Sequence, residues 1–242
     1  VPVPFISDTS SDSAALITTA QAAQKNTKDH FSIKEVPKYS GKSSVAAHGN
    51  KPYFTSREKQ NTNTFESYHK LDKLGRCGVA YANVSKDTMP TEARGEIGQI
   101  RPSGWHTVKY TGVVDGNYLY NRCHLIAYCL TAENANKKNL ITGTRYMNNE
   151  GMLPYEEKTA RYIDKTNNHV LYRVTPVFEG SNLVASGVLM EAYSVEDQGK
   201  GISFCVYCYN VQPGVAIDYA TGDSHLSGKN NQNSHKSSAK EH

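Results

Sequence analysis

The chain has 242 residues, of which 38% are hydrophobic, and its formal net charge at pH 7 is +4. This length and apolar content are enough for one large or two small packed domains. Every apolar run is far shorter than the roughly 20 residues that cross a bilayer, which excludes membrane insertion by a helix.

The positive charge lies mainly at the two ends of the chain. Residues 1–60 contain eight Lys and Arg against five Asp and Glu, and residues 224–242 contain three against one. Net charge therefore does not identify the middle of the chain as a nucleic-acid-binding region. Affinity for phosphate there requires a local cluster of cations.

The N-terminal 45 residues are rich in Ser, Thr, Lys and Pro, which predicts a flexible extension or a loosely docked arm. One short surface helix is expected over residues 14–23. The start lacks a basic leader before an apolar core, and its first residue is Val, so we expect a mature or trimmed form rather than a signal peptide.

The predicted domain covers residues 46–222, and its first half contains two clear strand signals. Residues 79–84 read as a strand, and the polar connection over 85–104 contains one short strand at 97–100. A hairpin over 105–121 turns at Asp115 and Gly116. The returning strand places His124 at its end.

The second half predicts a helix over residues 155–165, just behind Pro154, and four further strands. The strands are expected over residues 169–178, 183–195, 202–209 and 215–219. Residues 223–242 have almost no apolar content and predict a polar tail. The whole pattern is typical of a β-rich α+β domain.

Five cysteines cannot all pair within one chain, so at least one thiol is free and no disulfide framework is implied. Cys205 and Cys208 have the spacing of a zinc-ligand pair. Their surroundings alternate like a strand, so the two thiols face opposite ways, and no second pair is present to complete a site. We expect one thiol to be packed and the other to point outward.

Residues 118–149, the central segment, carry the residue types that phosphodiester chemistry needs. An alternating run brings His124, whose ordinary pKa of about 6.5 suits a general base, and a second run ends in Arg145, Asn148 and Asn149. The plain alternatives are a structural His at a strand end and an Asn that caps a turn. A nucleophilic pair of Cys123 and His124 is disfavoured, because neighbours on an extended chain face opposite sides.

The central segment resembles the DNA/RNA non-specific endonucleases of the ββα-metal (His-Me finger) type, above all the secreted streptococcal DNases, or streptodornases. The resemblance rests on NRCHLI at 121–126 and NLITGTRYMN at 139–148, and it continues from residue 68 to 222 through MLPYE, HVLYRVTPVF, VASGV and IDYATG. The family motif is DRGH. Arg122 and His124 match it, whereas Asn121 replaces the acid and Cys123 replaces the glycine.

The resemblance implies a secreted, monomeric endonuclease with a ββα-metal motif in its β-rich fold. His124 would be the general base, and Asn148 would hold one Mg²⁺, with Mn²⁺ or Ca²⁺ as substitutes. The products would carry 5′-phosphates. DNA would be bound through its phosphates without strong sequence preference, and RNA stays open as a second substrate.

Supporting roles fall to neighbouring residues. Asn121 occupies the position of the motif's acid, and Arg122 is expected to face away from His124 and to serve in structural pairing. Arg145 and Arg161 are candidates to bind the scissile phosphate.

The acid near the cation's water shell is either Glu156, which the MLPYE block favours, or Glu157, which lies four residues before Arg161. For all three helix residues the plain alternative is a solvated face with an i,i+4 ion pair. The rival functions are an inactive relative that binds nucleic acid or a host partner, and a secreted protein that acts through its N-terminal arm.

Overall fold

A six-stranded antiparallel sheet forms the centre of the molecule, for which we have a computed structural model that describes residues 31–228. The helix expected over residues 14–23 and the tail beyond residue 228 lie outside the described part. The strand order is β1-β8-β7-β6-β3-β2. The strands are β1 (Ser44–Ala46), β2 (Phe65–Tyr68), β3 (Ala80–Val84), β6 (Val170–Val177), β7 (Gly187–Ser194) and β8 (Ser203–Tyr209).

The three longest strands confirm the alternating segments predicted from the sequence. They are rich in β-branched and aromatic residues, which fit a pleated surface. All residues of β6 except the last are buried, so both faces of the sheet are covered. The expected β-rich α+β fold is confirmed.

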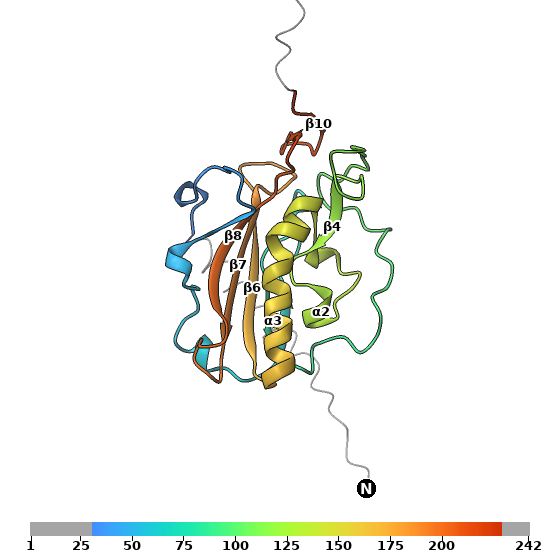
Figure 1. The fold of residues 1–242 in the computed structure, drawn as a ribbon. Coiled ribbons are helices and arrows are strands. Elements are labelled where there is room, and N and C mark those ends of the chain that lie inside the picture. The colour runs from blue at the N-terminus through green and yellow to red at the C-terminus, as the bar shows by residue number, and fades with distance from the viewer. Residues whose placement is uncertain (1–30, 229–242) are drawn as a thin grey trace, which may run out of the picture.

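Helix α3 (Leu153–Thr166) covers one face of the sheet (Figure 1). Pro154 lies in its first turn, and Asn167 ends it in a left-handed conformation whose N–H donates to the carbonyl of Ile163. Thr159 and Ile163 are buried on the side that faces the sheet. None of the helices in residues 31–228 is both long and apolar enough to cross a membrane.

The N-terminal segment covers the opposite face (Figure 1). Strand β1 pairs with β8, and the ring of Phe31 stacks on that of Tyr207 with 6.1 Å between centroids. Short 3₁₀ turns follow at η1 (Ile33–Glu35), η2 (His48–Asn50) and η3 (Glu58–Gln60). The described part of the predicted arm, residues 31–45, therefore lies against the sheet.

This cover changes the expectation for the two cysteines of β8. Cys208 lies in the core on the α3 side and Cys205 lies in a cluster on the other side, so they do face opposite ways. The expectation that one thiol points outward is wrong, because the N-terminal segment buries Cys205 completely. All five cysteines are free.

A separate two-stranded ribbon carries the central segment. Strands β4 (Tyr120–His124) and β5 (Leu140–Thr144) pair antiparallel, with α2 (Tyr128–Thr131) and the turn η4 (Lys137–Asn139) between them. A π-helical turn, η5 (Met147–Met152), then leads directly into α3. The order strand, strand, helix is that of a ββα unit.

The region before β4 is less regular than the sequence predicts. Residues 97–100 form a turn instead of a strand, with Ile100 N bonded to the carbonyl of Ile97. The predicted hairpin is reduced to one bridge between Lys109 and Tyr118. Its turn is at the expected place, since Gly116 and the next residue both have positive φ.

The predicted polar tail begins with a strand. Strand β10 (Ser224–Leu226) pairs with β9 (Val215–Ile217), so its first residues add to the folded part. The chain continues beyond the described residues from this end of the molecule.

A buried ion pair joins β6 to β7. Arg173 and Glu191 are directly opposite each other, and neither side chain is exposed. Arg173 donates to both carboxylate oxygens, from Nε at 2.7 Å and from Nη2 at 2.9 Å. Glu191 also accepts from the backbone N–H of Tyr53 at 2.7 Å. The pair therefore fixes the N-terminal cover as well as the sheet.

We expect Glu191→Ala to lower the free energy of unfolding by about 3–5 kcal/mol, because the buried Arg173 charge loses its two close hydrogen bonds and keeps only Glu58, at 3.8 Å. Urea denaturation measures the loss. The exposed pair of Lys86 and Asp164 provides the control. Asp164→Ala should lower the free energy of unfolding by about 1 kcal/mol or less. An equal loss in the two variants would contradict the larger contribution that we expect from the buried pair.

Candidate active site

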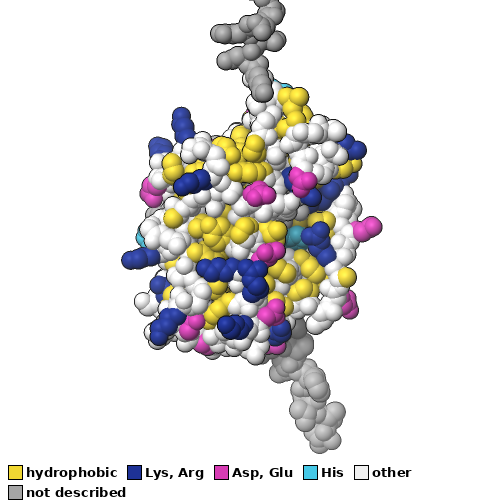
Figure 2. Space-filling model, in the orientation of Figure 1, with side chains coloured by type: hydrophobic (Ala, Val, Ile, Leu, Met, Phe, Trp, Pro, Cys, Tyr) yellow, Lys and Arg dark blue, Asp and Glu magenta, His cyan; other side chains and the backbone are white. Residues whose placement is uncertain are grey.

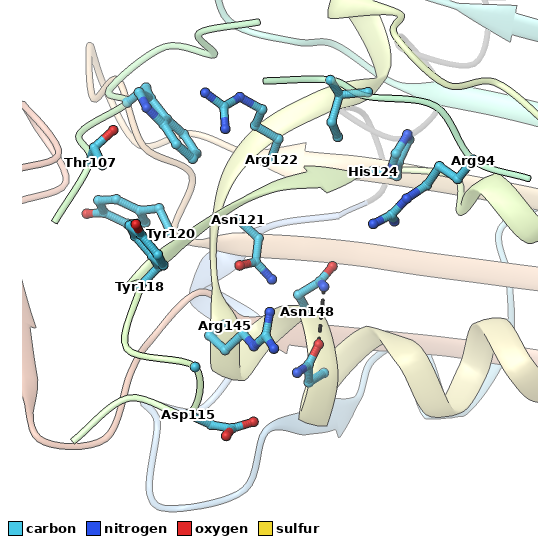
Figure 3. A pocket seen from close by; sticks show the side chains of 14 residues that line it. Arg94, Thr107, Asp115, Tyr118, Tyr120, Asn121, Arg122, His124, Arg145 and Asn148 are labelled. Carbon is cyan, nitrogen blue, oxygen red and sulfur yellow. Dashed lines mark hydrogen bonds between the residues drawn. The ribbon is translucent and has the colours of Figure 1, made fainter. Parts of the chain in front are cut away.

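A pocket of about 680 Å³ lies along β4 and the residues that follow β5 (Figure 3). Three parts of the chain form it: the connection before β4, β4 itself, and the start of the ββα helix. The lining residues are Arg94, Ile97, Trp105, Thr107, Asp115, Gly116, Tyr118, Tyr120, Asn121, Arg122, His124, Arg145, Asn148 and Asn149. The pocket thus brings together five of the eight predicted site residues.

His124 is the last residue of β4 and is only 7% exposed. Its Nε2 lies 2.9 Å from the backbone oxygen of Asn134. A carbonyl oxygen can only accept, so Nε2 carries the proton and Nδ1 keeps its lone pair. Burial lowers the pKa of His124, the positive charge of Arg94 lowers it further, and the Asn134 carbonyl opposes both. The ring is therefore a neutral base at pH 7.

Three arginines and one acid give the pocket a positive balance that the overall composition does not reveal. Arg94, Arg122 and Arg145 line it together with Asp115. Elsewhere, Lys and Arg are scattered over the visible face among other side chains (Figure 2). The fold thus gathers in one pocket the positive side chains that phosphate binding requires.

Arg145 is held ready for a ligand. It follows β5 directly, and its Nε is buried without a hydrogen-bond partner among residues 31–228. Its guanidinium lies next to Gly116, where an added Cβ would be 3.3 Å from Nη2. A buried donor without a partner is costly unless a ligand satisfies it, and phosphate oxygens match this fork.

Arg94 is a site residue that the sequence reasoning missed. It lies in the polar connection before β4 and stands beside His124 (Figure 3). It forms no ion pair with an acidic side chain in the described part of the chain. A lone Arg in an irregular segment carries no periodic signal, so only the folded chain reveals it.

Arg122 corrects one expectation. Residues two apart on a strand share a face, and Arg122 projects to the same side of β4 as His124 (Figure 3). Its Nε donates to the carbonyl of Ile100 at 2.5 Å, its Nη2 donates to that of Gly98 at 2.8 Å, and its guanidinium covers the ring of Trp105. It therefore holds the preceding connection in place.

The amide side chains gather on the other side of β4. Figure 3 shows Asn121 directed toward Asn148 and Arg145. Asn148 lies in η5, and its Nδ2 donates to Asn149 Oδ1 at 3.3 Å. Its Oδ1 lies 3.2 Å from the thiol of Cys123. A π-helical turn is a frequent feature of functional sites, because its extra residue redirects side chains.

The candidates on α3 lie outside the pocket, and the helix separates the two glutamates. Glu156 is buried against the core, where burial, and to a lesser degree the charge of Glu157, raises its pKa to about 8. Glu157 and Arg161 form an exposed pair 3.5 Å apart. Burial, and to a lesser degree the charge of Glu156, raises the pKa of Cys123, which contacts Asn148.

The donor set of the pocket fits a hard cation that keeps most of its water. The described residues contain no cluster of three or more His, Cys, Asp and Glu that could hold a metal ion. Besides the carboxylate of Asp115, the pocket offers the amide oxygens of Asn121, Asn148 and Asn149, which are neutral and hard. Mg²⁺ accepts such a site with few protein ligands, whereas a structural zinc site would require more.

Comparison with known proteins links this geometry to nucleases. A model of the DNA/RNA non-specific endonuclease family matches residues 55–196. A deoxyribonuclease from Streptococcus dysgalactiae subsp. equisimilis is 32% identical over 111 residues, which are 44% of this chain and 33% of that protein. The match thus spans about a third of the length of this curated relative.

Two solved structures share the fold over most of their length. NucA from Streptococcus agalactiae with a magnesium ion bound is 25% identical, with a TM-score of 0.69 over 85% of this chain and 97% of that one. The Sda1 nuclease with a bound zinc ion is also 25% identical, with a TM-score of 0.64 over 81% and 100% of the two chains.

The buried Glu156 predicts that stability depends on pH in the metal-free protein. Between its ordinary pKa of 4.5 and about 8, this carboxyl is protonated in the folded state and ionised in the unfolded state. Stability therefore falls as pH rises through this window. Glu156→Gln should be near neutral at pH 4 and increasingly stabilising toward pH 8. Urea denaturation with a chelator measures the difference, and a gain that is independent of pH would contradict the assignment.

Proposed function

Because the chain belongs to the DNA/RNA non-specific endonuclease family, we propose that it is a secreted, metal-dependent endonuclease that hydrolyses phosphodiester bonds in DNA. The observation that carries the proposal is the pocket itself. It brings to one cavity a neutral His124, the amide of Asn148 and a buried donor of Arg145 that is unpaired among residues 31–228. Secretion rests on the resemblance to the streptococcal DNases.

His124 acts as the general base in this proposal. Its Nδ1 accepts a proton from a water molecule, while the Asn134 carbonyl holds the protonated Nε2 and fixes the ring. The resulting hydroxide attacks phosphorus in line with the leaving 3′ oxygen, which gives 5′-phosphate products. Because burial and Arg94 lower the pKa of His124, the base is deprotonated at neutral pH.

Asn148 is the residue we assign to hold the cation, and we assign Asn121 and Asn149, which line the same pocket, to its water shell. When bound, Mg²⁺ supplies Lewis-acid stabilisation of the charge on phosphate and on the leaving oxygen. We assign Glu156 to support this side of the site. Glu157 and Arg161 pair with each other on the exposed face of α3, and we assign them no step.

Arg145 and Arg94 bind the non-bridging oxygens of the scissile phosphate. Arg145 has a buried donor that no group of the described residues accepts, and Arg94 stands beside the base. Their charges stabilise the negative charge that builds up during attack. We do not assign Arg122 to the phosphate, since its guanidinium already donates to two backbone carbonyls.

DNA is the substrate we propose, in line with the streptococcal deoxyribonuclease that this chain resembles. Contacts through phosphate carry no sequence information, so cleavage should show weak sequence preference and strong dependence on salt. We also propose that the protein acts as a monomer. RNA is tested in the same assay.

We expect His124→Ala to lower the rate of plasmid cleavage in Mg²⁺ by about 10²–10⁴-fold, because the general base is lost. DNA binding measured by fluorescence anisotropy should change little. His48, an exposed histidine in η2, provides the matched control, and His48→Ala should cleave like the wild type. Cleavage by folded His124→Ala at the wild-type rate would overturn the assignment, and no cleavage by the wild type would favour a binding function.

Arg145→Ala should lower kcat/KM by about 10–100-fold, the effect of one lost hydrogen bond to a charged group. Arg145→Lys should restore only part, because lysine keeps the charge and loses the fork. Arg161→Ala is the control: it removes the same positive charge from a position outside the pocket. It should change kcat/KM by less than about threefold. If Arg161→Ala reduces kcat/KM as much as Arg145→Ala does, phosphate binding is not centred on the pocket.

A further inference from the structure

We propose that Cys123 is a positioning residue whose thiol hydrogen holds the side-chain amide of Asn148 with its oxygen, instead of its NH₂ group, presented to the divalent cation. The proposal rests on the proposed function, in which Asn148 holds that cation. Cys123 is the residue of NRCH that stands in place of the family's glycine, and the mechanism otherwise gives it no role.

The thiol has one close oxygen acceptor. Cys123 Sγ lies 3.2 Å from Asn148 Oδ1, compared with 3.5 Å from Met152 Sδ and 3.7 Å from the carbonyl oxygen of His124. An amide oxygen is a better acceptor than a thioether, and it is also the nearest of the three. Cys123 is fully buried, so no bulk water competes for its hydrogen.

The other end of the same amide is also held. Asn148 Nδ2 donates to Asn149 Oδ1 at 3.3 Å. A 180° rotation of the amide would turn its NH₂ group toward the thiol and its oxygen toward the oxygen of Asn149. The first contact would be weaker, because a thiol sulfur is a poor acceptor, and the second would bring two acceptors together. Cys123 and Asn149 together therefore select one of two orientations that have almost the same shape.

Orientation matters because only one end of an amide can bind a cation. An amide oxygen has two lone pairs, so accepting from the thiol leaves one free for the metal. Groups behind a ligand that fix its direction commonly change metal affinity by about 10–100-fold when they are removed. A thiol is a weak donor, which places the expected effect at the lower end of this range.

β5 makes room for the thiol. A Cβ added at Gly143 would lie 2.6 Å from Cys123 Cβ, closer than packed atoms allow, and 3.3 Å from its Sγ. Glycine in the middle of a strand weakens it, and the close approach of Cys123 gives this glycine a reason. Gly143 lies diagonally across the ribbon from Cys123, whose direct partner on β5 is Ile141.

The test compares Mn²⁺ affinity, measured by electron paramagnetic resonance at pH 7, in the full chain and its variants. Cys123→Ala should weaken Mn²⁺ binding by about tenfold. Cys123→Ser keeps a donor and should stay within about threefold of the wild type. Cys205→Ala removes a thiol that is equally buried on the far face and should bind like the wild type. Thermal unfolding shows that each variant is folded.

Wild-type affinity in Cys123→Ala, or equal weakening in the Ser and Ala variants, would overturn the proposal. If Cys123→Ala does not fold, Cys123→Gly takes its place with the same expected loss and the same criterion. Asn148→Ala separates the two levels of inference. If it binds Mn²⁺ as tightly as the wild type, or if the wild type binds none, the assignment of Asn148 fails and the positioning role falls with it. Weakened binding in Asn148→Ala with wild-type binding in Cys123→Ala overturns the positioning role alone.

Discussion

The placement of the pocket depends on one buried amide that joins the β4–β5 ribbon to the main sheet. Asn210 follows β8 and is fully buried. Its Oδ1 accepts from Thr144 N at 2.8 Å, and its Nδ2 donates to the carbonyls of Thr142 and Ala185 at 3.1 and 2.9 Å. Arg145 follows this junction directly. Because a buried amide must keep all its partners, the end of β5 has one position relative to the sheet.

The electrostatics of the pocket follow from burial and arrangement. Burial keeps His124 neutral, and the fold gathers around it arginines that form no ion pair with an acidic side chain of residues 31–228. On the next helix, the same desolvation keeps Glu156 protonated in the absence of a cation. Although the positive excess of the chain lies near its ends, the fold thus forms a pocket that suits phosphate. A phosphate-binding pocket is what an endonuclease of this family requires.

Local sequence patterns predicted the elements in which hydrophobic residues recur at a regular spacing. Strands β6, β7 and β8 and helix α3 were predicted within a few residues, because their hydrophobic residues repeat at spacings of two or of three to four. The segment around residues 97–118 was not, since its order comes from Arg122 binding two carbonyls and covering Trp105. The direction of Arg122 follows from the alternation of a strand, in which residues two apart, such as Arg122 and His124, share a face.

The sequence by itself determined the sheet's long strands, the helix behind Pro154 and, through its resemblance to a family, the choice of His124 and Asn148. Only the tertiary structure decided that Arg94 stands beside His124, that Cys205 is covered, and that Glu156 and Glu157 lie in different environments. The physical reason is that periodicity records which side of an element is apolar. Which residues meet across the fold depends on contacts between distant parts of the chain, and no local pattern contains them.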